Sequence, residues 1–359
     1  MNNTFKFFFC CLLGLIVKSA TAQVLSTSPV PYVEKEIVYW DFHSGTIGED
    51  YTLYVHFPPG YDTTRSSYPV LYMTDGDWNM TVAMNCFNML RQDYTTTEPL
   101  IVGIGYGTRK NMRSRDLDPS TGGPKFLEFI EKEVIPFVKS KYRVTGNKSL
   151  YGYSYGGMFT TSVLFNHPDL FNMIFIGAPG NEGRDLVPSA RKYFASHKEL
   201  KSKVFLGVGS FEHETASNID TFRTYLLNQK AKGLDVATAV TPGAGHGAAL
   251  AQVMQNAIAF GYCQKHQAIQ LPEKSLETYT GIYAVAAEPK EKYKVYIEKG
   301  KLYFKGQGQP QEFTPYAKDS FFMYENEKAD IVFKTESHKA YILYGFVNEK
   351  SIRLDKVAN

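Results

Sequence analysis

The chain has 359 residues, of which 43% are hydrophobic and 21% are charged, and its formal net charge is +3. This composition is that of a globular protein and excludes a largely disordered chain. The length fits one large α/β domain followed by a smaller domain. No cluster of lysine and arginine accompanies the small net charge, so we expect no nucleic acid among the partners.

The N-terminus has the pattern of a secretory signal peptide. Lys6 precedes an apolar run over residues 7–17, and an Ala-Thr-Ala motif ends at Ala22. We therefore predict a signal peptide over residues 1–22, cleaved before Gln23, and a secreted or periplasmic mature protein. A membrane anchor is the alternative, although the 11-residue run is short against the roughly 20 residues that a spanning helix needs.

Removal of residues 1–22 takes away two lysines and no acid, which lowers the formal net charge from +3 to +1. It also removes Cys10 and Cys11. Three phenylalanines precede Cys10, where a lipidated cysteine has small residues, so we predict no lipoprotein. Cys86 and Cys263 remain, and an oxidising compartment permits a bridge between them. Two buried free thiols are equally compatible with their apolar surroundings.

Strands and helices alternate over most of the chain. Residues 34–42 and 50–58 alternate with a period of two around a glycine-containing gap and predict an antiparallel hairpin. Apolar segments bounded by turn residues predict buried parallel strands at 69–74, 100–106, 148–153, 173–179, 203–209 and 235–241. Helices are expected at 79–92, 125–142, 157–168, 191–200, 217–233 and 248–262. This order predicts an α/β fold with a doubly wound, mostly parallel sheet.

The pattern changes near residue 270. LPEKS (271–275) resembles a linker, and short alternating strands with glycine, asparagine and lysine turns follow it. We therefore predict an α/β domain over residues 23–268 and a small all-β accessory domain over residues 275–357.

A candidate nucleophile lies in GYSYG (152–156), which fits the pattern G-x-S-x-G. A short predicted strand precedes Ser154 and a helix without a breaker follows it. A serine on such a strand-to-helix turn is exposed at the edge of the sheet and adjoins a helix N-terminus, which favours developing negative charge. We predict that Ser154 is the nucleophile of an enzyme.

A serine hydroxyl needs a base, and the base needs an orienting acid. His246 directly follows the predicted strand 235–241 and lies between glycines, so its loop can project an imidazole over the sheet edge. The acid is expected after the strand 203–209, where Glu212 and Glu214 are both available. We favour Glu212, which is nearer the strand end; Glu214 is the alternative and also suits a helix N-terminus.

An oxyanion needs two backbone N–H donors. One is expected from Tyr155, which follows the nucleophile. The other is expected from the loop after strand 69–74, where Gly76 lets the backbone turn inward and the N–H of Asp77 becomes the donor.

An ordered set of segments resembles the esterase D / enterochelin (siderophore) esterase-like branch of the α/β-hydrolases. The set is PVLYMTDGD, IVGIGY, RSRDLDP, FIEKEVIPFVKSKYRV, YGYSYGG and NHPDLF, within residues 35–262. The resemblance implies a serine hydrolase without metal or organic cofactor. It places Ser154, Glu212 and His246 at the triad positions, with Asp77 and Tyr155 at the oxyanion hole. The all-β tail resembles small β-domains appended to secreted hydrolases.

Three residues are expected to contact substrate. Arg113 matches a substrate-contacting arginine of siderophore-hydrolase members by resemblance; a structural salt bridge to Asp116 is the alternative. Trp78 suits an aromatic or sugar-bearing substrate, or packing. Tyr153, beside the nucleophile, is larger than the residues common there in the family, as is Tyr155, so the shape of the acyl pocket does not carry over.

These expectations combine into a secreted or periplasmic serine carboxylic-ester hydrolase that acts through an acyl-enzyme. The candidate substrates are a siderophore ester or lactone, a carbohydrate-linked acetyl or feruloyl ester, and a peptide or thioester. The alternatives are a non-catalytic ligand-binding protein on a hydrolase scaffold and an acyltransferase. No cluster of Cys, His and carboxylates has metal-ligand spacing.

Overall fold

The computed structural model of the protein describes residues 37–180, 186–285, 288–324, 326–336, 339–346 and 351–359. The predicted signal peptide, its cleavage site, Cys10 and Cys11 lie outside the described residues.

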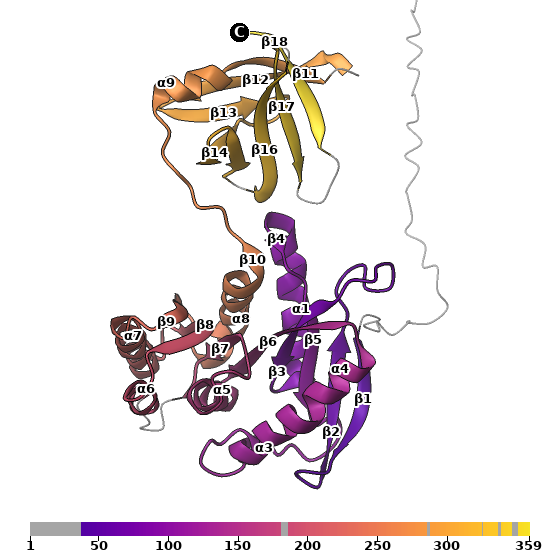
Figure 1. Ribbon diagram of the computed structural model, residues 1–359, viewed down its shortest axis with the longest axis vertical. Helices are drawn as coiled ribbons and strands as arrows, with labels where there is room; N and C mark the ends of the chain where they lie inside the picture. The colour runs from indigo at the N-terminus through magenta and orange to yellow at the C-terminus, as the bar shows by residue number, and fades with distance from the viewer. Residues whose placement is uncertain (1–36, 181–185, 286–287, 325, 337–338, 347–350) are drawn as a thin grey trace, which may run out of the picture. The chain divides into compact units, whose positions relative to one another are not determined.

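An eight-stranded, mostly parallel sheet forms the first part of the fold, with the strand order β1-β2-β5-β3-β6-β7-β8-β9 (Figure 1). The strands are β1 (Ile37–Ser44), β2 (Glu49–His56), β3 (Tyr68–Met73), β5 (Leu100–Gly105), β6 (Val144–Tyr153), β7 (Met173–Gly177), β8 (Glu199–Gly209) and β9 (Lys232–Thr241). The expected hairpin is confirmed, since β1 and β2 pair antiparallel with Ile37 opposite His56. From β5 to β9 every pairing is parallel.

Helices cover both faces of this sheet, as the alternation of strands and helices predicted. They are α1 (Gly76–Asp93), α2 (Arg113–Asp116), α3 (Gly123–Phe129), α4 (Ile135–Lys141), α5 (Tyr155–Asn166), α6 (Val187–Phe194), α7 (His213–Asn228) and α8 (His246–Tyr262). On one face α1 packs against α8 through an edge-to-face contact of Phe87 and Tyr262. On the other, Phe126 of α3 contacts Phe159 of α5. A two-stranded ribbon pairs β4 (Thr95–Thr96) with β10 (Cys263–Gln264).

Two predicted helices differ from the structure. The helix expected at 125–142 is interrupted by the π-helical turn η1 (Ile130–Val134) between α3 and α4. Pro136 explains the interruption, because it lacks an N–H and its ring displaces the carbonyl one turn earlier. The helix expected at 191–200 ends at Phe194, and β8 already begins at Glu199.

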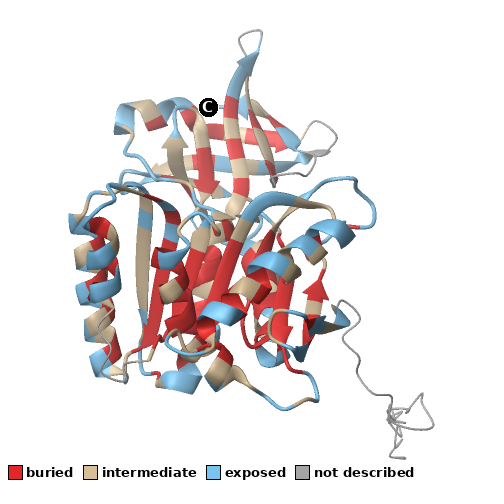
Figure 2. Ribbon diagram, turned by 60° about the horizontal axis from the view of Figure 1, so that its bottom comes forward, coloured by how far each residue is buried: buried red, intermediate tan, exposed pale blue. Residues whose placement is uncertain are grey.

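The core of this part follows the strands. Figure 2 shows buried residues along the sheet and on the inner sides of its helices, with exposed residues on the outer helix surfaces. Tyr51, Tyr72 and Phe175 are among the largest fully buried side chains of the sheet. Parallel strands that are covered on both faces have continuous apolar sequences. These strands could therefore be predicted from the sequence.

The C-terminal part is a closed, all-antiparallel barrel of eight strands, in the order β11 to β18. The strands are β11 (Gly281–Val285), β12 (Glu288–Glu298), β13 (Lys301–Lys305), β14 (Gln311–Ala317), β15 (Ser320–Met323), β16 (Asn326–Glu336), β17 (Lys339–Phe346) and β18 (Ile352–Ala358). Tyr283, Phe313 and Phe321 fill its interior. The all-β prediction is therefore confirmed. The predicted linker instead contains the start of a short helix, α9 (Glu273–Leu276), which continues into the 3₁₀ turn η2 (Glu277–Tyr279).

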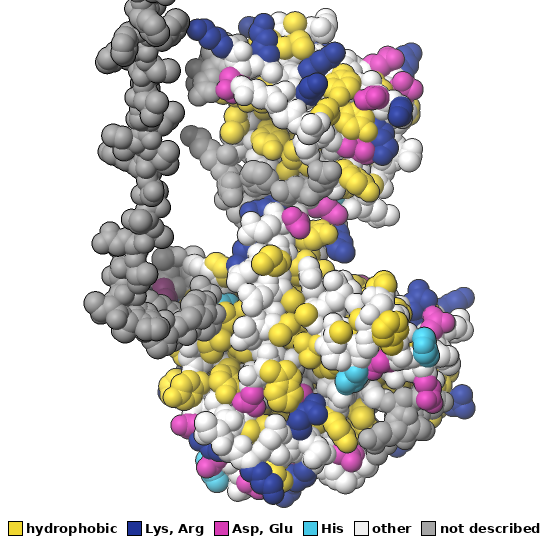
Figure 3. Space-filling model, turned by 180° about the vertical axis from the view of Figure 1, so that it is seen from behind, with side chains coloured by type: hydrophobic (Ala, Val, Ile, Leu, Met, Phe, Trp, Pro, Cys, Tyr) yellow, Lys and Arg dark blue, Asp and Glu magenta, His cyan; other side chains and the backbone are white. Residues whose placement is uncertain are grey.

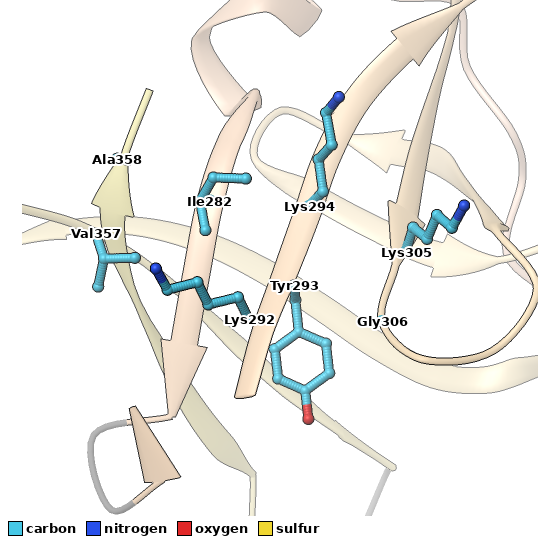
Figure 4. A pocket seen from close by; sticks show the side chains of 8 residues that line it. All are labelled: Ile282, Lys292, Tyr293, Lys294, Lys305, Gly306, Val357 and Ala358. Atoms are coloured by element: carbon cyan, nitrogen blue, oxygen red, sulfur yellow. The ribbon is translucent and has the colours of Figure 1, made fainter. Parts of the chain in front are cut away.

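A depression of about 420 Å³ lies on the outer surface of the barrel and carries three lysines (Figure 4). Lys294 of β12 lies directly opposite Lys305 of β13, and Lys292 lies two residues before Lys294 on the same strand. Figure 4 shows the three side chains pointing in different directions, so their ammonium groups do not converge on one point.

One face of the molecule carries charged side chains of both signs. Figure 3 shows basic and acidic side chains interspersed on the face it presents. Within the described residues, no helix is both long and apolar enough to cross a membrane. Cys86 is buried, Cys263 is half-buried, and both are free thiols, so the bridge that the sequence left open does not form.

Candidate active site

Ser154 lies at the sharp turn between β6 and α5. Its backbone has φ of 61° and ψ of −119°, and a positive φ with this ψ is rare for a residue with a side chain. The Ser154 N–H donates to the carbonyl of Gly177 (2.9 Å), and the Ser154 carbonyl accepts from the N–H of Met158 (3.0 Å). The turn is thus held on both sides, in the strained geometry typical of a nucleophile elbow.

Two glycines make this turn possible. A Cβ at Gly152 would lie 2.1 Å from the carbonyl oxygen of Gly156, and a Cβ at Gly156 would lie 2.3 Å from Oγ1 of Thr74. Both distances are far inside van der Waals contact, and the first involves backbone that cannot move aside. The glycines around Ser154 therefore permit the close approach of α5 to β3 and β6.

Glu212 and His246 meet at the neighbouring strand ends. Nδ1 of His246 lies 2.6 Å from Oε2 of Glu212, while Oε1 of Glu212 accepts from the N–H of Gly209 (3.2 Å). The Glu212 side chain is 15% exposed and the His246 side chain 47%. With Nδ1 bonded to a carboxylate, Nε2 is the nitrogen that remains for a reacting group. Glu214 lies exposed in the first turn of α7 instead.

The loops that carry these two side chains are joined through their backbones. The N–H of Gly243 donates to Oγ of Ser210 (2.8 Å), and the N–H of Phe211 donates to the carbonyl of Ala244 (3.0 Å). A Cβ at Gly209 would lie 2.4 Å from that same Ala244 carbonyl oxygen. These contacts therefore join the two loops beside the Glu212–His246 contact.

Tyr153 was expected to contact substrate, but its side chain is directed into the protein. The residue is 4% exposed, and its hydroxyl donates to the carbonyl of His246 (2.5 Å). The rings of Tyr153 and His246 lie 5.2 Å apart. Burial raises the pKa of the Tyr153 hydroxyl above its usual value. This position leaves little surface for a substrate and indicates a role in holding the loop of His246.

Asp77 is the second residue of α1, where backbone N–H groups have no acceptor within the helix. Its carboxylate turns away from the helix axis. It accepts from the hydroxyl of Tyr54 (2.9 Å) and from the N–H groups of Tyr106 (2.8 Å) and Gly107 (2.8 Å). Burial, followed by the hydrogen bond to Asp77, raises the pKa of Tyr54 to about 12. Tyr155 is the first residue of α5, so its N–H also lies at a helix N-terminus.

Arg113 forms its salt bridge with Asp75 rather than with Asp116. Nε and Nη2 of Arg113 donate to the two carboxylate oxygens of Asp75 at 2.7 and 3.0 Å. The neighbouring Arg115 takes Asp116 instead, at 2.7 Å. Arg113 thus forms a salt bridge, as the alternative prediction said, but its partner is Asp75 and not Asp116.

Asp75 is almost completely buried, with 1% of its side chain exposed. Burial raises the pKa of its carboxyl group, and the hydrogen bonds from Arg113 oppose that rise. The same hydrogen bonds raise the pKa of Arg113. The pairing with Arg113 therefore offsets part of the cost of burying this carboxyl group.

Arg113 also lies close to two aromatic rings. Its guanidinium carbon is 5.5 Å from the ring centroid of Trp78 and 5.4 Å from that of Tyr155. Trp78 is 42% exposed and follows Asp77 in α1. The predicted residues Arg113, Trp78, Asp77 and Tyr155 are thus brought together.

One small cavity adjoins the first turn of α5. It has about 130 Å³ and is lined by residues that include Met158, Pro179 and Leu186. The N–H of Met158 donates a hydrogen bond to the carbonyl of Ser154, so Met158, which lines the cavity, lies one helical turn beyond the serine. Within the described parts of the chain, no group of three or more His, Cys, Asp or Glu side chains could hold a metal ion.

Sequence reasoning missed Asp75 and Tyr54. Asp75 was visible as the first acid of the segment DGD, and a carboxylate between a buried strand and a helix needs a cationic partner. Tyr54 carried no signal, because the pairing of β2 with β5 decides that its hydroxyl reaches Asp77.

A doubly wound sheet with a positive-φ serine on the turn between a strand and a helix is the arrangement of the α/β-hydrolases, a class that includes esterases. A family model described as "Putative esterase" matches residues 44–247. Because that match covers more than half of the chain, the protein belongs to this esterase family. The resemblance to siderophore esterases seen in the sequence is confirmed by the relatives.

Two curated relatives are siderophore esterases. The chain is 29% identical over 171 residues to a siderophore triacetylfusarinine C esterase of Aspergillus fumigatus, a match that covers 42% of this chain and 58% of the relative. It is 24% identical over 228 residues to the ferri-bacillibactin esterase BesA of Bacillus subtilis, covering 54% of this chain and 79% of that protein. The match to the Aspergillus protein thus spans less than two thirds of its length.

Solved structures support the fold. The BES protein from Bacillus cereus superposes with a TM-score of 0.57 at 20% identity, covering 65% of this chain and 98% of that one. The siderophore hydrolase EstA from Aspergillus nidulans gives a TM-score of 0.57 at 21% identity, covering 66% and 98%.

Proposed function

We propose that the protein is a secreted or periplasmic serine carboxylic-ester hydrolase that acts through an acyl-enzyme. The observation that carries this proposal is the 2.6 Å contact between Glu212 and Nδ1 of His246, at the same edge of the sheet as the strained turn of Ser154. A base oriented by a carboxylate beside a serine at a helix N-terminus is the arrangement that activates a hydroxyl.

The reaction would run in two stages. Ser154 Oγ attacks the ester carbonyl carbon while Nε2 of His246 takes the hydroxyl proton, and the negative oxygen accepts from the N–H groups of Asp77 and Tyr155. The C–O bond to the alcohol then breaks, and the leaving alkoxide takes the proton from His246. Water, deprotonated by the same imidazole, attacks the acyl-enzyme; the bond to Ser154 Oγ breaks, Oγ takes the proton back from His246, and the carboxylic acid is released.

A siderophore ester or lactone is the substrate class that we favour, since the two relatives described above are siderophore esterases. Arg113 and Trp78 suit this class. The guanidinium has five N–H donors, and the two bonds to Asp75 leave Nη1 to bind oxygen-rich groups of a substrate. Trp78, at 42% exposed, can stack on an aromatic ring of the substrate.

Secretion rests on the sequence of residues 1–22, which has the charged, apolar and small-residue regions of a signal peptide. N-terminal sequencing of the protein expressed in full should give Gln23 as the first residue. An N-terminus at Met1 in the exported fraction would contradict the proposal of cleavage.

A fluorophosphonate probe and an ester panel test the function together. We expect the probe to modify Ser154, and Ser154→Ala to abolish both labelling and hydrolysis of p-nitrophenyl, feruloyl, acetyl-sugar and catecholate-siderophore esters. A folded wild-type protein that is neither labelled nor active would favour the non-catalytic alternative. Ester products formed with an added alcohol acceptor, and absent without it, would favour the acyltransferase.

A further inference from the structure

We propose that Asp75 and Arg113 are positioning residues for the oxyanion hole. They fix the segment that carries the N–H of Asp77, the first half, relative to the segment that carries the N–H of Tyr155, the second half. The inference rests on the proposed function and deepens it. In this role the pair acts on every ester, including one with no group for an arginine to bind.

The first half of the oxyanion hole is built on Asp75. This residue adopts a left-handed conformation (φ 56°, ψ 44°), and its carbonyl accepts from the N–H groups of Trp78 (3.3 Å) and Asn79 (3.0 Å). The start of α1, and with it the N–H of Asp77, therefore takes its direction from Asp75. Aspartate tolerates this conformation better than most residues, but it still needs support from its surroundings.

The second half begins at Tyr155, and it adjoins Asp75 as well. A Cβ at Gly156 would lie 3.5 Å from Oδ2 of Asp75, so the first turn of α5 approaches the buried carboxylate closely. Asp75 thus lies between the N-termini of α1 and α5, where two helix dipoles favour its negative charge.

Arg113 contacts both halves. Its Nε and Nη2 hold the carboxylate of Asp75 from one side. Its guanidinium carbon lies 5.5 Å from the ring of Trp78, which follows Asp77, and 5.4 Å from the ring of Tyr155. One planar cation therefore bridges the segment of each predicted oxyanion donor, from a helix, α2, that belongs to neither.

Loss of this cation has a defined consequence. A buried carboxylate without its partner is costly, so Asp75 must then take up a proton or move toward water. Either change releases the start of α1. Loss of a whole oxyanion donor costs about 10²–10³ in rate, and displacement of one should cost part of that.

Arg115 offers a matched control. It lies on the same four-residue helix α2, and it also pairs with a buried aspartate, Asp116. Arg115→Ala therefore breaks an ion pair with a buried aspartate of the same loop, and a second one with Glu49. The contacts with the rings of Trp78 and Tyr155 belong to Arg113. A comparison of Arg113→Ala with Arg115→Ala separates oxyanion positioning from general loosening of the loop.

The readouts are the rate at which a small alkyl fluorophosphonate labels Ser154 and the hydrolysis of phenyl acetate, which has no group for a guanidinium to bind. For Arg113→Ala we expect about a 10–100-fold fall in labelling rate and in kcat, with little change in KM. For Arg115→Ala we expect the labelling rate and kcat to change by about threefold or less. The shift in Tm should be similar in the two variants. Arg113→Lys, which keeps the charge but not the two-point contact, should lie between wild type and Arg113→Ala.

Chemical rescue provides a second measurement. Guanidinium ion at millimolar concentration should raise the rate of Arg113→Ala about tenfold, because it can enter the space that the Arg113 side chain leaves and bind Asp75. It should not raise the rate of Arg115→Ala.

Equal losses in the Arg113 and Arg115 variants, or an Arg113→Ala defect that appears with siderophore esters but not with phenyl acetate and the probe, would overturn the positioning role. The second outcome would leave Arg113 as a substrate contact. Failure of the proposed function is distinct from both, because wild-type protein would then show no labelling of Ser154.

Discussion

The phenol of Tyr153 donates a hydrogen bond to the backbone carbonyl of His246, at 2.5 Å, so the residue before the proposed nucleophile supports the residue proposed as its base. The contact joins the end of β6 to the start of α8 across two intervening strand ends. We expect it to set the position of the imidazole relative to Ser154.

Tyr153→Phe removes this hydroxyl and keeps the ring. We expect kcat to fall by about 3–10-fold with KM nearly unchanged, and stability to fall by about 1 kcal/mol, the usual contribution of one hydrogen bond. Steady-state kinetics and urea denaturation measure the two effects.

Tyr262→Phe is the control for that substitution. Its hydroxyl is also buried and bonds to Ser149, within the core and apart from the proposed triad. It should cost similar stability and leave kcat within about twofold. If the two variants lose kcat equally, Tyr153 has no special role at His246.

The acid of the proposed triad is tested by two glutamates that lie two residues apart. Glu212→Gln should lower kcat by about 10²–10⁴, because an amide cannot stabilise the imidazolium that forms on His246. Glu214→Gln, on the exposed first turn of α7, should change kcat by less than about twofold. A reversed order, measured on any ester that the wild type hydrolyses, would move the acid to Glu214.

The turn at Ser154 predicts a strict requirement for glycine. Gly156→Ala places a Cβ 2.3 Å from Oγ1 of Thr74, and we expect it to lower the free energy of unfolding by about 1–3 kcal/mol or more. Gly146→Ala, where no atom lies within 4 Å of the added Cβ, should stay within about 0.5 kcal/mol of wild type. Equal unfolding midpoints in urea for the two variants would show that α5 can move away from β3 at little cost.

The two described cysteines should be unreactive at moderate pH. Burial raises the pKa of the Cys86 thiol to about 11 and that of Cys263 to about 12. A raised pKa keeps the thiol protonated, so at pH 8 about one Cys86 in a thousand is a thiolate, against about a quarter of ordinary thiols.

Ellman's reagent followed by peptide mapping tests this. Cys86 and Cys263 should react slowly in the native protein at pH 8, faster as the pH rises toward 10, and rapidly in denaturant. Reaction of native Cys86 at the rate of a free thiol would contradict its burial.

Most of the architecture could be predicted because it depends on local pattern. Apolar runs bounded by turn residues located the parallel strands, and glycines around Ser154 located the elbow. The failures have local causes as well. Pro136 introduced the π-helical turn, and Glu199 and Leu200, which have the composition of a helix end, begin the strand β8 that pairs with β9.

The sequence by itself determined the fold class, the all-β tail and the order of Ser154, Glu212 and His246 along the chain. Tertiary structure alone decided which groups meet: Glu212 rather than Glu214 at His246, Asp75 rather than Asp116 at Arg113, and Tyr153 in the core rather than on a substrate surface. It also decided that Cys86 and Cys263 stay apart and that eight strands close into a barrel. The physical reason is that periodicity and turn residues report the environment of each segment, whereas a partner tens of residues away is chosen by strand order and helix packing.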